Sequence, residues 1–127
     1  MEECRRVCIE GLVEGGFQRV VDAIRTLIRL RRLGPVDRLG FALDRRVALE
    51  AFTEVMRVFD AVYMSAKETE EGRCCEAEDS RCLVKCPARP PRDDEVRRVV
   101  YCLESPCWRE FVRALVAEAL AEVKPVG

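Results

Sequence analysis

The eight cysteines are the residues with the most evident chemistry in this sequence. Two of them, Cys4 and Cys8, lie near the N-terminus, and the other six are Cys74, Cys75, Cys82, Cys86, Cys102 and Cys107. Cysteines in such numbers can bind zinc, hold an iron–sulfur cluster, take part in redox catalysis or form structural disulfides.

The spacing of the cysteines favours structural disulfides. Zinc sites prefer C-x2-C or C-x4-C pairs, whereas Cys74 and Cys75 are adjacent, three residues separate Cys82 from Cys86, and the chain has no histidine. An iron–sulfur cluster could use the last four cysteines, but the usual C-x2-C-x2-C run is absent. A C-x-x-C redox motif is absent as well. We therefore expect eight disulfide-bonded cysteines, in a pairing that the sequence leaves open, and no metal site.

Cys4 and Cys8 share one face of a predicted helix. At this spacing their Cβ atoms lie about 5–6 Å apart, whereas a disulfide needs about 3.5–4.5 Å. We expect each to bridge a distant cysteine and to join the N-terminal helix to the cysteine-rich loop or to the last helices. Each such bridge stabilises the fold by about 2–4 kcal/mol.

Arginines form the second chemically suggestive pattern. Arg25, Arg29 and Arg32 recur at i, i+4 and i+7 and so align along one flank of a predicted helix. The flank is either a solvated face near a helix C-terminus or a track that binds successive phosphates. Three more arginines could extend it, so the candidate nucleic-acid-binding residues are Arg25, Arg29, Arg32, Arg38, Arg45 and Arg46.

Conventional catalysis is not expected. Without histidine, acid–base chemistry would fall to other groups, and no pair of carboxylates is placed to converge. Gly11, Gly15 and Gly16 lack the spacing of a phosphate-binding loop. The sequence therefore predicts a binding or assembly protein with no catalytic residue and no cofactor.

Length, charge and composition limit the classes of protein to which the chain can belong. The 127 residues suffice for one domain, 1–127, and a net charge of -1 argues against nucleic-acid binding through bulk charge. No apolar run could span a membrane and the acidic start M-E-E-C does not resemble a signal peptide, so we expect a cytoplasmic protein. The lack of asparagine and the excess of arginine over lysine are typical of thermophiles, in which intracellular disulfides occur.

Apolar periodicity predicts about five helices. The clearest follows Asp44, a predicted N-cap, and runs to about Thr69, with Ala48, Phe52 and Phe59 on its inner face. The other predicted helices are Glu3–Glu14, Phe17–Leu33, Glu95–Glu104 and Pro106–Lys124, with a turn at Gly34-Pro35 and a short helix or turn up to Leu43. We expect an all-α bundle in which residues 70–93 form a cysteine- and proline-rich insertion, a loop or a short β-hairpin, between the third main helix and the C-terminal helices.

One segment resembles a known family. It consists of Val36-Asp37-Arg38-Leu39, then Ala42-Leu43, and then a long helix that holds Val47, Ala48, Leu49 and Arg57. This pattern resembles the small subunit of the archaeal type I-A CRISPR interference complex (Cascade), a small and mainly helical family.

The resemblance implies a non-enzymatic subunit of an antiviral, RNA-guided complex. Such a subunit would contact other subunits of the ribonucleoprotein and hold single-stranded or R-loop DNA by its backbone through a basic patch, because guide pairing supplies the sequence specificity. No membrane contact is implied, and self-association stays open. The alternative is a disulfide-stapled helical module for protein–protein contact, for instance an archaeal or viral accessory factor.

Overall fold

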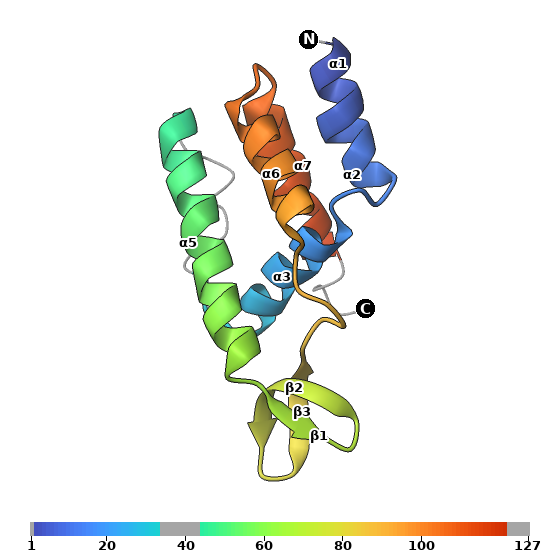
Figure 1. The fold of residues 1–127 in the computed structure, drawn as a ribbon, viewed down its shortest axis with the longest axis vertical. Coiled ribbons are helices and arrows are strands. Elements are labelled where there is room, and N and C mark those ends of the chain that lie inside the picture. The colour runs from blue at the N-terminus through green and yellow to red at the C-terminus, as the bar shows by residue number, and fades with distance from the viewer. Residues whose placement is uncertain (1, 34–43, 122–127) are drawn as a thin grey trace.

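The first helical stretch carries Cys4 and Cys8. A computed structural model describes residues 2–33 and 44–121 (Figure 1). In it, the stretch is built from α1 (Glu2–Cys4), the π-helix η1 (Arg5–Glu10) and α2 (Gly11–Val13). The stretch ends at Val13, and Gly15 follows with a φ of 87°, which glycine readily adopts, as the Gly15-Gly16 pair predicts.

Helix α3 (Gln18–Arg29) runs through the core. Its inner face carries Val20, Ile24 and Leu27, each almost fully buried, as the apolar period predicts. Phe17, just before the helix, packs edge-on against Phe111 with the ring centroids 5.4 Å apart. This packing ties the start of α3 to the C-terminal helix.

The end of α3 differs from the prediction. The helix stops at Arg29 because the backbone closes a Schellman motif, in which the N–H of Arg31 donates to Ile28 O and that of Arg32 to Leu27 O, both at 3.0 Å. Arg31 takes the left-handed conformation, with φ of 57°. The predicted end at Leu33 is therefore wrong, and the residue that ends the helix in the left-handed conformation is an arginine. Residues 34–43, which include Arg38 and most of the motif behind the family resemblance, lie outside the described residues.

Helix α5 (Arg45–Met64) is the long helix that the sequence predicts. Asp44 is its N-cap, as expected, and a carboxylate oxygen of Asp44 accepts a 2.8 Å hydrogen bond from Val47 N. Ala48, Phe52 and Phe59 face the core, as predicted. The helix ends before the predicted Thr69.

A three-stranded antiparallel sheet follows α5, so the all-α prediction is wrong. It consists of β1 (Lys67–Thr69), β2 (Gly72–Glu78) and β3 (Arg81–Lys85) in the order β1-β2-β3. The register of β2 against β3 shifts between Cys74 and Ala77. Figure 1 shows the sheet at the end of α5, below the helices. The molecule is therefore mixed α/β, and strands fill much of the segment predicted as a loop or a short β-hairpin.

Two C-terminal helices complete the helical body. They are α6 (Asp93–Glu104) and α7 (Trp108–Ala121), which pack against each other and against α3 and α5 (Figure 1). Ser105 lies between the two helices in the extended conformation, and its Oγ donates a 2.6 Å hydrogen bond to Cys102 O. Both helices were predicted, although α7 begins at Trp108 rather than at Pro106.

A buried carboxylate on α6 accepts hydrogen bonds from the N-terminus of α3. Glu95 is 6% exposed, and its Oε1 accepts hydrogen bonds from Arg19 N at 3.0 Å and from Val20 N at 3.3 Å. These N–H groups lie in the first turn of α3, where no intrahelical carbonyl is available. A residue 76 positions away therefore caps this helix.

The described helices give no membrane span. None of them combines the length with the apolar character that crossing a bilayer requires.

Candidate nucleic-acid interface and cysteine clusters

Arg25 is turned toward α7. Its Nε donates to Ala119 O at 3.3 Å and its Nη2 to Glu118 O at 3.0 Å. Both carbonyls belong to the last described turn of α7. Nη1 lies 3.1 Å from Asp22 Oδ1, and the residue is only 8% exposed. Arg25 is thus held against the last described turn of α7, apart from the exposed arginines at the end of α3.

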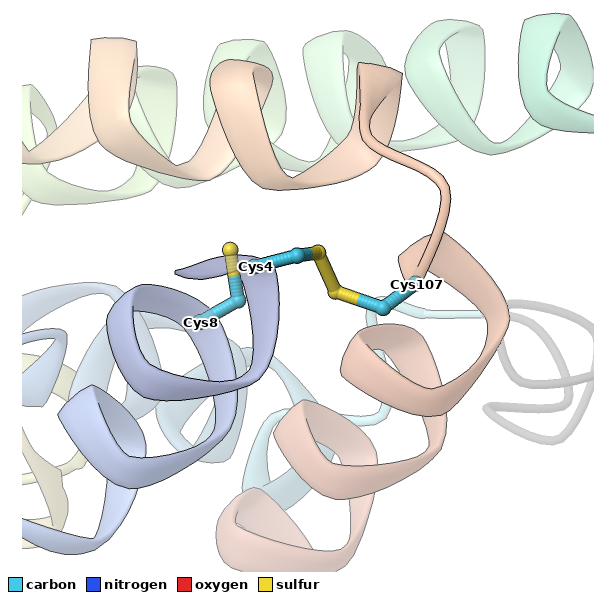
Figure 2. Close-up of side chains that lie close together, drawn as sticks. All are labelled: Cys4, Cys8 and Cys107. Carbon is cyan, nitrogen blue, oxygen red and sulfur yellow. A yellow bond between two sulfur atoms is a disulfide. The ribbon is translucent and has the colours of Figure 1, made fainter. Parts of the chain in front are cut away.

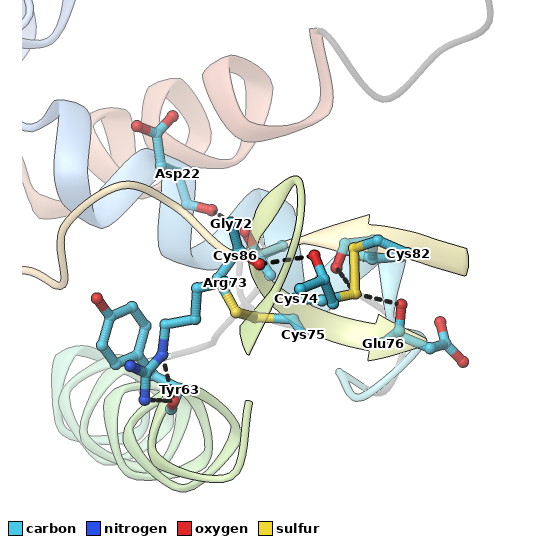
Figure 3. Close-up of a disulfide and its surroundings, with 12 residues drawn as sticks. Asp22, Tyr63, Gly72, Arg73, Cys74, Cys75, Glu76, Cys82 and Cys86 are labelled. Carbon is cyan, nitrogen blue, oxygen red and sulfur yellow. Dashed lines mark hydrogen bonds between the residues drawn. A yellow bond between two sulfur atoms is a disulfide. The ribbon is translucent and has the colours of Figure 1, made fainter. Parts of the chain in front are cut away.

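Two other arginines donate to carbonyls at helix C-termini. Arg45 Nη1 donates to Glu104 O, the last residue of α6, at 2.7 Å. Arg73 on β2 donates from Nη2 to Tyr63 O at 2.8 Å, close to the end of α5, and its guanidinium lies 4.4 Å from the Tyr63 ring centroid (Figure 3). Arg73 was not singled out from the sequence, because no local pattern connects a strand residue to the helix before it. These contacts use the preference of cations for helix C-termini.

The terminal arginine group consists of Arg29, Arg31 and Arg32. All three are exposed, and they occupy the last turn of α3 and its Schellman cap. The negative end of the helix dipole favours cations here. Two members were predicted as nucleic-acid-binding residues, and Arg31 joins them because the helix ends earlier than expected. Three guanidinium groups within four positions are the strongest local cationic feature of the predicted arginine flank.

The remaining predicted arginines lie elsewhere. Arg46 is exposed, and its Nε is 3.5 Å from Glu50 Oε1, while Arg38 lies outside the described residues. Arg45 contacts the end of α6, just before α7, whereas Arg25 contacts the far end of α7. With 14 residues, α7 is about 20 Å long. The described arginines thus do not gather into one patch.

The described part of the resembling segment is mostly structural. Ala48 is buried in the core, and Arg57 forms hydrogen bonds with Glu54 on the same face of α5. The hydrogen bond from Arg57 and its charge hold the pKa of the Glu54 carboxyl below its usual value. Arg57 is therefore engaged within its own helix.

Two disulfides join the N-terminal helical stretch to the C-terminal helices. They are Cys4–Cys107 and Cys8–Cys102, with Cα atoms 6.3 Å and 5.7 Å apart, which is ordinary for disulfides. Figure 2 shows Cys4 of the N-terminal stretch bonded to Cys107, just before α7, with Cys8 beside Cys4 on the same stretch. The prediction that Cys4 and Cys8 each bridge a distant cysteine is confirmed.

The other two disulfides staple the sheet. Cys74 pairs with Cys82 and Cys75 with Cys86, so β2 is bonded twice to β3 and the residue after it (Figure 3). Cys86 N also donates to Arg73 O at 3.1 Å. All eight cysteines are therefore paired, as expected, in two separate groups of four.

Comparison with known proteins adds no relative. No protein-family model, curated protein or solved structure matches the chain.

Proposed function

We propose that this chain is a non-enzymatic subunit of an RNA-guided complex of the type I-A kind, and that its terminal arginine group contacts the backbone of single-stranded DNA. The observation that carries the proposal is the exposed Arg29, Arg31 and Arg32 at a helix end whose backbone is fixed by a Schellman motif. Guanidinium groups bind phosphate through paired hydrogen bonds. The resemblance around Val36–Leu49 supplies the setting of the complex.

The position of α3 favours a rigid contact surface. Arg25 fixes the helix to α7, and Glu95 of α6 caps its start. Less conformational entropy is therefore lost when phosphates bind than on a mobile loop. A local group of this kind is compatible with a net charge of -1, because phosphate contacts act over a few ångströms at physiological salt.

A salt titration tests the DNA contact. Binding of a labelled single-stranded oligonucleotide is measured by fluorescence anisotropy for the wild type and for the triple variant Arg29→Glu, Arg31→Glu, Arg32→Glu. We expect weaker binding and a plot of log K against log salt whose slope is smaller by about 2, since each phosphate contact contributes about 0.7 on single strands.

The matched control reverses three exposed arginines on other segments, Arg6, Arg89 and Arg97. It changes the net charge equally, so equal losses of binding in both triple variants would contradict a local site. Far-ultraviolet circular dichroism checks that both variants keep their helices.

Membership of the complex is tested in the native cells. A tagged copy of the chain is purified and its bound RNA is sequenced, with a tagged unrelated protein as control. Short guide RNAs together with further protein subunits are the expected result. Purification without RNA would contradict this part of the proposal.

The stapled sheet favours the second candidate function, a protein–protein contact module. Its two turns carry Glu70, Glu71 and Asp79, and the side chain of Leu83 is 48% exposed. Acidic side chains repel DNA but suit a basic protein surface. Failure of the chain to bind DNA, combined with loss of partner subunits on charge reversal of Glu70 and Glu71, would support this function.

A further inference from the structure

We propose that Cys4, Cys8, Cys102 and Cys107, here called the core cysteines, form a zinc site when their two disulfides are reduced. The Sγ atoms of Cys4, Cys8 and Cys107 all lie within 4.8 Å of one another (Figure 2). Cys102 is disulfide-bonded to Cys8. In a tetrahedral site with four thiolates, a Zn–S distance of about 2.3 Å places the sulfurs about 3.8 Å apart. Three of the four sulfurs thus already lie within reach of one ion, and Cys102 is bonded to one of them.

The spacing of the core cysteines matches that of zinc ligands. Three residues separate Cys4 from Cys8 and four separate Cys102 from Cys107. Structural zinc sites use pairs with two to four intervening residues, so the three-residue spacing that counted against zinc at Cys82 and Cys86 does not by itself exclude a zinc pair. The adjacent pair within residues 74–86 still disfavours zinc there, whereas the two pairs of suitable spacing lie at opposite ends of the chain and meet only when the helices pack.

The surroundings suit thiolates. Cys8 and Cys102 are fully buried, and Cys4 and Cys107 are at most 5% exposed. Ser105 Oγ lies 3.0 Å from Cys4 Sγ and 3.5 Å from Cys107 Sγ, and its own hydrogen bond to Cys102 O fixes this polar group beside the sulfurs. Cys107 directly precedes α7, whose positive dipole end stabilises a thiolate.

The sheet cysteines do not offer the same arrangement. Within residues 2–33 and 44–121, Cys4, Cys8 and Cys107 are the one group of three potential ligands that meets the 4.8 Å limit. Cys74, Cys75, Cys82 and Cys86 are therefore expected to stay outside the metal site.

Reduction of the two core disulfides takes its electrons and protons from a dithiol. Two molecules of a dithiol reductant transfer four electrons and four protons to the two core disulfides, which gives four thiols and two oxidised dithiol molecules. Zinc then binds the sulfurs as thiolates and displaces their protons. A disulfide oxidant reverses the electron transfer and releases the ion. The N-terminal stretch stays joined to α6 and α7 in either state, by covalent bonds or by the metal.

Cobalt and zinc titrations test the site. The full chain is reduced with dithiothreitol, freed of it anaerobically, and titrated with Co²⁺. We expect one ion per chain, with sulfur-to-cobalt charge-transfer bands and the strong visible bands of tetrahedral cobalt, both removed by one equivalent of Zn²⁺. Absence of these bands, whether the reduced chain stays folded or not, would overturn the proposal.

Alkylation locates the ligands without a variant. The reduced chain is treated with iodoacetamide with and without Zn²⁺, and the rate at each cysteine is read by mass spectrometry. Zinc should slow modification at the four core cysteines and leave Cys74, Cys75, Cys82 and Cys86 unchanged. Protection of the sheet cysteines instead would overturn the assignment.

Two variants provide the matched control. Cys8→Ser with Cys102→Ser should lower the bound cobalt from one ion per chain to none. Cys75→Ser with Cys86→Ser removes an equal number of thiols from the sheet and should leave one ion bound. Equal binding by both variants would contradict the site.

Discussion

Arg25 donates a hydrogen bond to the backbone carbonyl of Ala119, 94 positions later in the chain. With the second bond to Glu118 O and the ion pair to Asp22, this contact joins α3 to the end of α7. The substitution Arg25→Ala removes all three interactions from a nearly buried site. We expect it to lower the free energy of unfolding by about 2–3 kcal/mol, since hydrogen bonds from a charged donor are among the stronger ones. Guanidinium chloride denaturation measures the loss.

The control for this prediction is Arg32→Ala. Arg32 is exposed just beyond the same helix, and replacing such a residue changes stability by about 0.5 kcal/mol or less. Equal losses at the two positions would show that Arg25 does not hold α3 against α7. In that case Arg25 would again be a candidate for binding phosphate.

Arg31 occupies a left-handed position that glycine usually fills. That conformation costs a residue with Cβ about 1–2 kcal/mol, partly offset by the lower chain entropy that such a residue has in the unfolded state. We therefore expect Arg31→Gly to be more stable than Arg31→Ala by about 1 kcal/mol in chemical denaturation.

The same two variants separate stability from binding. Both remove one guanidinium group, so both should lower the salt slope of DNA binding by about 0.7. If Arg31→Gly and Arg31→Ala unfold at the same denaturant concentration, the left-handed backbone is not strained. If their salt slopes equal that of the wild type, Arg31 does not contact phosphate.

Local patterns predicted the helices but not the sheet. The apolar period that places Ala48, Phe52 and Phe59 inward identifies α5 whatever its partners are. Strand β2 reads Gly-Arg-Cys-Cys-Glu-Ala-Glu and lacks the β-branched and aromatic residues typical of strands. Two disulfides bond it to Cys82 and Cys86, and the sequence could not assign these pairs.

At the candidate site, the predicted arginine patch differs from the structure because arginines bind helix ends that are far away in the sequence. The partners of Arg25 and Arg45 lie 94 and 59 positions away, so the sequence shows regular spacing of arginines but not which helix end each one binds. The cysteine pairs likewise depend on partners that are distant in the sequence. Geometry excluded a Cys4–Cys8 bridge, whereas the choice of Cys107 and Cys102 depends on how the helices pack.

Glu95 caps α3 through a single oxygen. The substitution Glu95→Ala leaves the N–H groups of Arg19 and Val20 without this acceptor, and we expect a loss of about 2 kcal/mol. Glu95→Gln keeps an accepting oxygen and should lose less than half as much. Amide hydrogen exchange at Val20 should quicken in Glu95→Ala alone. Equal exchange rates in the two variants would contradict the capping role.

The two core disulfides should stabilise the fold in a coupled way. Cys4–Cys107 closes a loop of 103 positions. Once it is closed, breaking Cys8–Cys102 opens only a ring of about ten residues. The chain-entropy relation gives about 3 kcal/mol for the small ring and about 4.7 kcal/mol for the long loop. Removing either disulfide alone should therefore cost about 3 kcal/mol.

The double removal reveals this coupling. We expect it to lower the free energy of unfolding by about 7–8 kcal/mol, more than the sum of the two single removals. The reason is that no disulfide then joins the N-terminal stretch to the C-terminal helices. Serine pairs at each disulfide and at both are compared by chemical denaturation with a chelator present, so that no metal replaces the missing bond. Single losses that simply add would mean that each disulfide restricts the unfolded chain independently, as two separate loops would.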